Sequence, residues 1–190
     1  MIKYKLIGKI VLALTTLVVQ DPVLMAQDSC EYLVWSDEFN KEGAPNPEKW
    51  GYDVGGHGWG NNELQNYTDS RANSFVQDGK LTIKAVKSNE SWTSARLVTK
   101  GKGDWLYGRI EVKAKLPEGR GTWPAIWMLP TDWAYGGWPS SGEIDIMEHV
   151  GYEMGKVHGT IHTEAYNHSI GTQKGGSIEV ENVATQFHVY

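Results

Sequence analysis

The sequence has very little cysteine: Cys30 is the single one among 190 residues. One cysteine cannot form an internal disulfide, so the folded chain must be held together by its hydrophobic core. Basic residues are outnumbered, with 18 Lys and Arg against 23 Asp and Glu, which gives a formal net charge of −5 at pH 7. This acidic balance argues against nucleic acids and anionic membranes as partners, and it is compatible with a neutral polysaccharide.

Long apolar runs are lacking as well. An apolar run covers residues 10–19, but Gln20-Asp21-Pro22 ends it, so it is too short to span a membrane as a helix. Three lysines precede the run, and Leu24-Met25-Ala26 after it fits a cleavage site. We therefore interpret residues 1–26 as a secretory signal peptide. Residues 27–190 would be one mature domain, secreted to the cell exterior or the periplasm.

The lone cysteine lies just after this cleavage site, where a lipid anchor could be attached. Lipoprotein signals have a characteristic short motif before the cysteine, and Gln27-Asp28-Ser29 matches it poorly. Lipid anchoring through Cys30 is therefore the less favoured alternative. We expect a monomer without a membrane span.

After residue 26 the sequence lacks repeats, low-complexity segments and helical periodicity, and alternation of apolar and polar residues takes their place. Residues 80–86 and 108–116 both alternate with period two. In the second segment the core-facing residues are Ile110, Val112, Ala114 and Leu116, and the charged residues between them face water. Turn signals such as Asp78-Gly79 separate the runs. Because one dry and one wet face is typical of antiparallel sheets, we expect an all-β fold, a β-sandwich.

Three carboxylates lie close together at Glu143, Asp145 and Glu148, and apolar residues alternate with them. This pattern predicts a strand with one face on the core and the other on a ligand or solvent. In an unbroken strand, Glu148 would point away from the other two carboxylates. A β-bulge near Ile146-Met147 would bring all three to one face and keep Ile144 and Ile146 in the core.

The spacing of the two glutamates suits one kind of chemistry. With the bulge, their Cα atoms would be about 13 Å apart at roughly 3.3 Å per residue. Side chains that lean toward each other would bring the carboxyl groups to about 5–6 Å, the range found in retaining glycosidases. The alternatives are a solvated acidic strand and a calcium-binding cluster.

The segment Glu143–Glu148 resembles the active-site strand of family 16 glycoside hydrolases, in the laminarinase-like branch that carries an extra residue in this strand. Four further segments resemble family motifs in the expected order: Trp35–Phe39, Gly58–Gln65 with Tyr67-Thr68, Tyr107–Val112 and Gly121–Leu129. The resemblance implies a jelly-roll β-sandwich, of the concanavalin A-like kind, with a concave substrate groove. The family domain continues well past Tyr190, so we expect that C-terminal strands are missing. Residues 27–190 alone should then be unstable or prone to aggregation, and inactive.

The resemblance also implies roles for the three carboxylates. Glu143 would be the nucleophile that forms the glycosyl-enzyme, and Glu148 would protonate the leaving oxygen and then activate water. Asp145 would hydrogen-bond Glu143 and modulate the charge of the site. Repulsion between nearby carboxylates helps to separate their pKa values, as an ionised nucleophile beside a protonated acid requires. Catalysis of this kind requires no cofactor.

Aromatic residues are the candidates for binding sugar rings. Trp123 and Trp127 share one face of a predicted strand, and Trp138 comes just before the acidic strand. Indole rings stack on the apolar faces of pyranose rings, although packing in the core is the alternative for each tryptophan. Asn61, in a glycine-rich loop, is expected to contact sugar hydroxyls unless it caps its own turn. His162 is expected to line the groove.

Two sets of residues in the sequence resemble parts of metal sites. His158 and His162 are four residues apart, but this spacing indicates zinc only on a helix, and here it predicts a strand. We therefore expect no zinc site. Enzymes similar to this chain often carry a structural calcium away from the groove, and Glu38 and the backbone of Gly79 would be the matching ligands.

Three classes of function remain open. The first is a secreted endo-β-1,3-glucanase, including one that also cuts mixed β-1,3-1,4-glucan; the second is a non-catalytic glucan-binding domain. The third is a calcium-stabilised structural or adhesion domain. The extra residue in the acidic strand also occurs in family members that act on agar or carrageenan, so it does not identify the polysaccharide. The motif Gly58–Gln65 favours laminarin.

Overall fold

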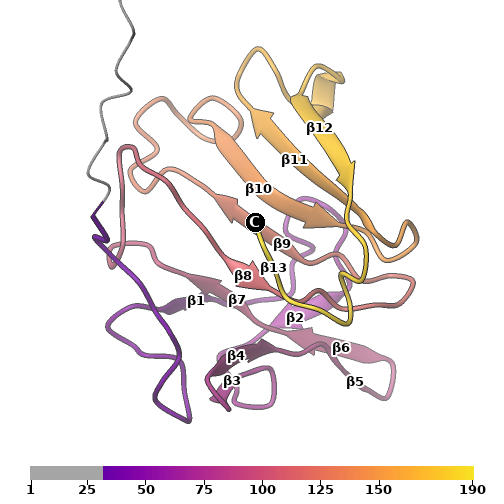
Figure 1. Cartoon of the computed structure of the whole chain (residues 1–190). Helices are drawn as coiled ribbons and strands as arrows, with labels where there is room; N and C mark the ends of the chain where they lie inside the picture. Colours follow the sequence, from indigo (N-terminus) through magenta and orange to yellow (C-terminus); the bar gives the residue numbers. More distant parts are fainter. Residues whose placement is uncertain (1–31) are drawn as a thin grey trace, which may run out of the picture. The chain divides into compact units, whose positions relative to one another are not determined.

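The computed structural model describes residues 32–190, and the folded unit is Trp35–Tyr190. The expected signal peptide and Cys30 lie outside the described residues. Within residues 32–190 the secondary structure is almost entirely β, with a single 3-10 turn, η1 (His168–Ile170) (Figure 1). The all-β fold expected from the alternating pattern is confirmed. No helix in this part of the chain is long and apolar enough to cross a membrane.

Thirteen strands make up the described part of the chain. In order they are β1 (Gly51–Asp53), β2 (Gln65–Tyr67), β3 (Ser74–Gln77), β4 (Lys80–Ile83), β5 (Val86–Ser88), β6 (Ser91–Ser94), β7 (Arg96–Val98), β8 (Lys113–Ala114), β9 (Ala125–Met128), β10 (Glu143–His149), β11 (Lys156–His162), β12 (Lys174–Glu179) and β13 (His188–Val189).

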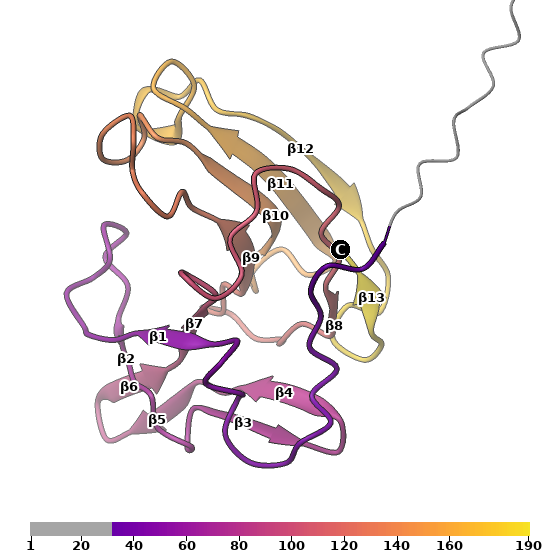
Figure 2. The same ribbon diagram turned by 90° about the vertical axis from the view of Figure 1, so that its left-hand side faces the viewer.

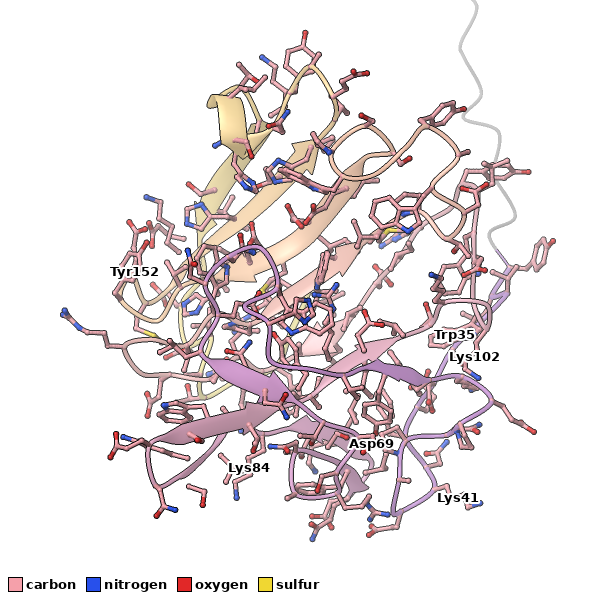
Figure 3. The ribbon with its side chains drawn as sticks, turned by 180° about the vertical axis from the view of Figure 1, so that it is seen from behind. Trp35, Lys41, Asp69, Lys84, Lys102 and Tyr152 are labelled. Carbon is pink, nitrogen blue, oxygen red and sulfur yellow. The ribbon has the colours of Figure 1, made fainter. Side chains whose placement is uncertain are left out.

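The largest sheet is four-stranded and antiparallel, in the order β12-β11-β10-β9. Smaller ladders join β1 to β7, β13 to β8 and β3 to β4, and a three-stranded sheet has the order β2-β6-β5. Figure 2 shows the four-stranded sheet as one layer, with β8 and β13 beside it. Charged side chains such as Lys41, Asp69 and Lys84 are exposed at the periphery of the other ladders (Figure 3).

The core lies against the face of the four-stranded sheet that points away from the three carboxylates. Met147 and Val157 from this sheet pack against Leu116 and Val183, and all four side chains are buried. Ala114, Ile126, Val180 and Tyr190 complete the cluster. Burial of a side chain as large as Met147 contributes roughly 1.5–3 kcal/mol to folding, so this cluster is a main source of stability.

The same face is only partly covered. Ile144 is 47% exposed and its partner in the ladder, Ile161, is 48% exposed. The expectation that Ile144 lies in the core is therefore wrong for the described residues, although the alternation assigned it to the correct face. Ile144 lies outside the part of the sheet that Leu116 and Val183 cover. Met147, the second residue of the predicted bulge, is the side chain that reaches the core, with 1% exposure.

This difference makes a testable prediction about stability. Met147→Ala should lower the free energy of unfolding by about 2–5 kcal/mol, because it leaves a cavity in the core. Ile144→Ala, on the same strand, should cost less than half of that because the Ile144 side chain is already half in water. Urea unfolding of the two variants provides the measurement, and equal losses would contradict the described packing.

The two alternating segments form shorter strands than the pattern predicts. In residues 108–116 the burial alternates as expected, with Leu116 4% exposed, but only β8 pairs as a strand. Val112 exchanges backbone hydrogen bonds with Tyr190 just beyond β8. The strand predicted over residues 80–86 ends at Ile83, and Val86 already belongs to β5. Lys84, between the two, still bonds to the backbone and side chain of Asn73.

Candidate active site

A β-bulge in β10 brings the three carboxylates to one face of the sheet. Glu143 pairs with His162 and Asp145 with Thr160, after which the register shifts so that Glu148 pairs with His158. His162, Thr160 and His158 alternate along β11 and therefore share a face, so the three acidic residues opposite them share it too. The same shift occurs against β9, between Asp145 and Met147. The predicted bulge is confirmed; we call this side of the sheet the acidic face.

Indole N–H groups hold both glutamates. Trp138 Nε1 donates a hydrogen bond to Glu143 Oε2, and Trp123 Nε1 donates one to Glu148 Oε1 over 3.0 Å. A hydrogen bond to a carboxylate is stronger than one between neutral groups, and it fixes the direction of the side chain. Each glutamate is thus oriented by a tryptophan from a loop beside the sheet, Trp123 before β9 and Trp138 before β10.

Asp145 lies between the glutamates and is nearly inaccessible to solvent, at 5% exposure. Its Oδ2 is 3.2 Å from His162 Nε2. Burial first, and then the charges of Glu143 and Glu148 and a hydrogen bond with Glu143, together raise the pKa of Asp145 to about 8. Asp145 therefore keeps its proton near neutral pH and can donate it in the hydrogen bond to Glu143.

The raised pKa of Asp145 predicts how stability depends on pH. The folded state holds this proton from pH 3.8 to about 8, whereas the unfolded state releases it near 3.8. The free energy of unfolding should therefore fall as pH rises through this window. Asp145→Asn cannot ionise, so its melting temperature should rise relative to wild type as pH increases. Thermal melts across the window test this, with Asp69→Asn, an exposed site, as the control; a difference independent of pH would contradict it.

The structure places the predicted sugar-binding residues in different surroundings. Trp123 is 65% exposed beside Glu148. Trp127 is half-buried on the acidic face, where it pairs with Asp145 and the Arg96 guanidinium lies over its ring. Asn61 is exposed in the glycine-rich turn and donates its backbone N–H to Gly58.

Trp138 belongs to a small aromatic cluster. Its ring centroid is 4.7 Å from that of His168 and 5.8 Å from that of His162. His162 is 6% exposed, so it acts as a buried neighbour of Asp145 rather than as an open part of the surface. Sequence reasoning missed His168, because η1 lies in a segment without periodicity and nothing in the pattern places it next to Trp138.

The proposed calcium ligands lie apart from the acidic face. Glu38 is exposed, and Gly79 lies in the turn between β3 and β4, where Asp78 and Gly79 both have positive φ as a tight hairpin requires. In residues 32–190 no group of three or more His, Cys, Asp or Glu side chains is arranged to hold a metal ion. Glu38 and a carbonyl alone are too few for the six to eight oxygens that calcium takes, so this site stays a prediction.

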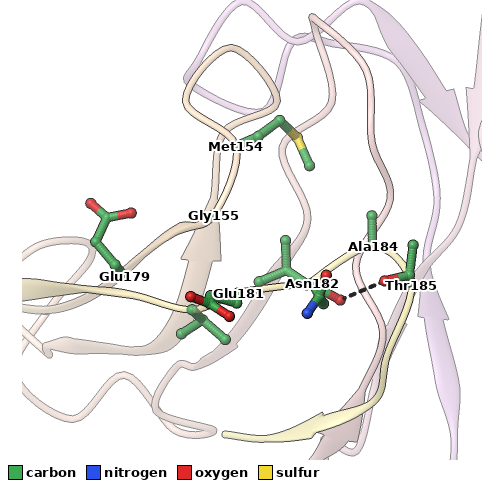
Figure 4. Close-up of a pocket in the computed structure, with 9 residues that line it drawn as sticks. Met154, Gly155, Glu179, Glu181, Asn182, Ala184 and Thr185 are labelled. Atoms are coloured by element: carbon green, nitrogen blue, oxygen red, sulfur yellow. Dashed lines mark hydrogen bonds between the residues drawn. The ribbon is translucent and has the colours of Figure 1, made fainter.

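A pocket of about 460 Å³ lies away from the predicted residues. It is lined by residues 154–155 and 179–185, and Figure 4 shows the carboxylates of Glu179 and Glu181 at its rim. None of the residues predicted for catalysis or sugar binding lines this pocket. The acidic face therefore remains the candidate active site.

Comparison with known proteins finds similar sequences and structures. Residues 61–190 match the family described as glycosyl hydrolases family 16. The chain is 62% identical over 164 residues to a beta-glucanase from Rhodothermus marinus, covering 83% of this chain and 57% of that protein. It is 42% identical over 179 residues to glucan endo-1,3-beta-glucosidase A1 from Niallia circulans, covering 83% and 26%.

A solved structure shows the same fold. The laminarinase from Rhodothermus marinus aligns with a TM-score of 0.80 at 60% identity, over 83% of this chain and 65% of that one. The jelly-roll fold expected for the chain is thereby confirmed. The chain spans less than two thirds of the length of these relatives. On the matched motifs, the identity and the fold, the chain belongs to glycoside hydrolase family 16.

Proposed function

We propose that this chain belongs to an endo-acting glycoside hydrolase that cleaves β-1,3-glucan or mixed β-1,3-1,4-glucan with retention of configuration. The observation that carries the proposal is the bulge in β10, which places Glu143, Asp145 and Glu148 on one face. In support, each carboxylate has a nitrogen partner: an indole for each glutamate and the His162 imidazole for Asp145. Nitrogen partners of this kind suit carboxylates that have separate roles, whereas a metal site needs several carboxylate oxygens that are free to bind the same ion.

In the first step, the Glu143 carboxylate attacks the anomeric carbon of the sugar while Glu148 donates its proton to the glycosidic oxygen. The bond to the leaving sugar breaks, and a covalent ester between the sugar and Glu143 forms. In the second step, Glu148 takes a proton from water, whose oxygen attacks the anomeric carbon and releases Glu143. Two inversions at the same carbon give retention overall.

Asp145 and Trp138 prepare Glu143 for both steps. The protonated Asp145 stabilises the Glu143 carboxylate by a hydrogen bond, and the Trp138 indole donates a hydrogen bond to Glu143 Oε2. Both contacts weaken when the charge moves into the ester and return when the carboxylate is released. Trp123 holds Glu148 in the same way and exposes most of its ring for contact with a sugar.

The polysaccharide can be identified by one set of assays. Reducing-sugar release from laminarin, lichenan, agarose and carrageenan should show that the full-length protein is most active on laminarin, with lichenan second. Highest activity on agarose or carrageenan would show that the substrate is a galactan and not a β-glucan. Binding to laminarin without any release would instead support a non-catalytic glucan-binding domain, the main alternative function.

The remaining properties are proposals that rest on the sequence. The protein is secreted to the cell exterior or the periplasm after removal of residues 1–26, and lipid anchoring through Cys30 is the less favoured alternative. It acts as a monomer on a neutral polysaccharide and requires no cofactor for catalysis. A structural calcium bound at Glu38 and Gly79 would raise its melting temperature when the ion is added after chelation.

A further inference from the structure

Arg96 contacts two tryptophans that come from distant parts of the sequence. Its guanidinium carbon lies 4.4 Å from the ring centroid of Trp59 and 4.4 Å from that of Trp127. Trp59 belongs to the glycine-rich turn between β1 and β2, and Trp127 lies on β9 directly opposite Asp145. One cation thus joins a loop to the acidic face of the catalytic sheet.

The β1–β7 ladder explains how Arg96 is held in place. Asp53 on β1 is the direct partner of Arg96 on β7, so the two side chains leave the ladder on the same face. Arg96 Nε lies 3.1 Å from Asp53 Oδ2, and the Arg96 side chain is only 17% exposed. The ion pair fixes one edge of the guanidinium and leaves its flat faces available to aromatic rings.

The loop that contains Trp59 is joined to β2 at its base, where Gly55 and Tyr67 exchange backbone hydrogen bonds. Trp59 has a left-handed backbone with φ of 48°, and the neighbouring Gly58 and Gly60 have positive φ as well. The Trp59 indole N–H donates a hydrogen bond to the carbonyl of Gly55, and the Trp59 ring lies 4.4 Å from that of His57, so both of these contacts stay within the loop. The direct contacts of the Trp59 ring with the strands are those with the Tyr67 ring, at 5.6 Å, and with the Arg96 guanidinium.

We propose that Arg96 is a positioning residue that fixes the Trp59 loop and the Trp127 ring beside the catalytic carboxylates, so that both are preorganised for the polysaccharide. This inference rests on the proposed function, since its effect is on glucan binding. A guanidinium is planar and weakly hydrated, so it can contact two aromatic rings at once. The ammonium of lysine is compact and strongly hydrated, so it cannot make both contacts. The role therefore requires arginine and not merely a positive charge.

Two variants and a control test the proposal in the full-length protein. Arg96→Lys keeps the charge near Asp53 but loses the flat contact, and Asp53→Asn keeps the arginine but weakens its anchor. Arg71→Lys, at an exposed arginine, is the matched control. For Arg96→Lys, KM on laminarin should rise about tenfold, the equivalent of one cation–π contact, while kcat changes by less than about twofold. Asp53→Asn should give an intermediate rise in KM, and the control should give none.

A second readout does not depend on activity. Chymotrypsin cleaves after tryptophan and tyrosine, so cleavage at Trp59 under native conditions reports how firmly the loop is held, with the exposed Tyr107 as an internal reference. Arg96→Lys should speed cleavage at Trp59 and leave cleavage at Tyr107 unchanged. Unchanged cleavage at Trp59 would overturn the proposal, and so would a fall in kcat without a rise in KM. If wild type cleaves no glucan, the proposed function fails, and proteolysis still decides whether Arg96 holds the loop.

Discussion

Glu143→Gln should lower laminarin hydrolysis by a factor of about 10⁴ or more, because the amide cannot form the glycosyl ester that the first step requires. The side chain keeps its shape and can still accept the hydrogen bond from Trp138, so the fold and glucan binding should persist. Steady-state rates and the affinity for laminari-oligosaccharides of the full-length protein provide the two measurements.

Glu179→Gln is the matched control, because Glu179 is an exposed glutamate on β12 of the same sheet. It should leave the rate within about twofold of wild type, as surface substitutions away from a site usually do. A small added nucleophile gives a further test. Azide should restore turnover of a dinitrophenyl β-glucoside by Glu143→Ala and give a glycosyl azide of inverted configuration. Hydrolysis that survives in Glu143→Gln would mean that another residue is the nucleophile.

Glu148→Gln should lower laminarin hydrolysis by about 10²–10⁴-fold, the usual contribution of a general acid-base residue. The loss should depend on the leaving group. Glucosyl leaving groups need a proton from Glu148, whereas dinitrophenolate leaves without one, so formation of the glycosyl-enzyme from the aryl substrate should be nearly normal. Pre-steady-state release of dinitrophenol measures this step. An equal loss on both substrates would show that Glu148 is not the acid.

The shared face of the three carboxylates on β10 could be predicted from their spacing in the sequence alone. Glu143 and Glu148 are an odd number of residues apart, so an alternating strand can place both on one face only if it contains an extra residue. The register shift after Asp145 shows where that extra residue lies. Local alternation decides which side of a strand a residue lies on, and this can be read from the sequence alone. It does not decide what covers that side, which is why Ile144 was expected in the core and is 47% exposed.

Contacts between distant segments could not be predicted in the same way. Arg96 lies on β7, Trp59 in a loop, and Trp127 on β9, and no spacing in the sequence relates them. Trp127 was expected to offer its ring to a sugar, but one contact of that ring is already made by Arg96. Likewise, the pKa of Asp145 depends on burial and on two charges that folding brings close. The sequence shows the neighbours of Asp145 along the strand, but it does not show how deeply Asp145 is buried.

In the proposed mechanism, Glu143 and Glu148 cleave a β-glucan in two displacements at one carbon. The most direct test is proton NMR of the first product formed from laminarin by the full-length protein, recorded before the anomers equilibrate. Two displacements predict that the β-anomer appears first and the α-anomer follows only by mutarotation. Initial appearance of the α-anomer would show a single displacement and would contradict the roles assigned to both glutamates.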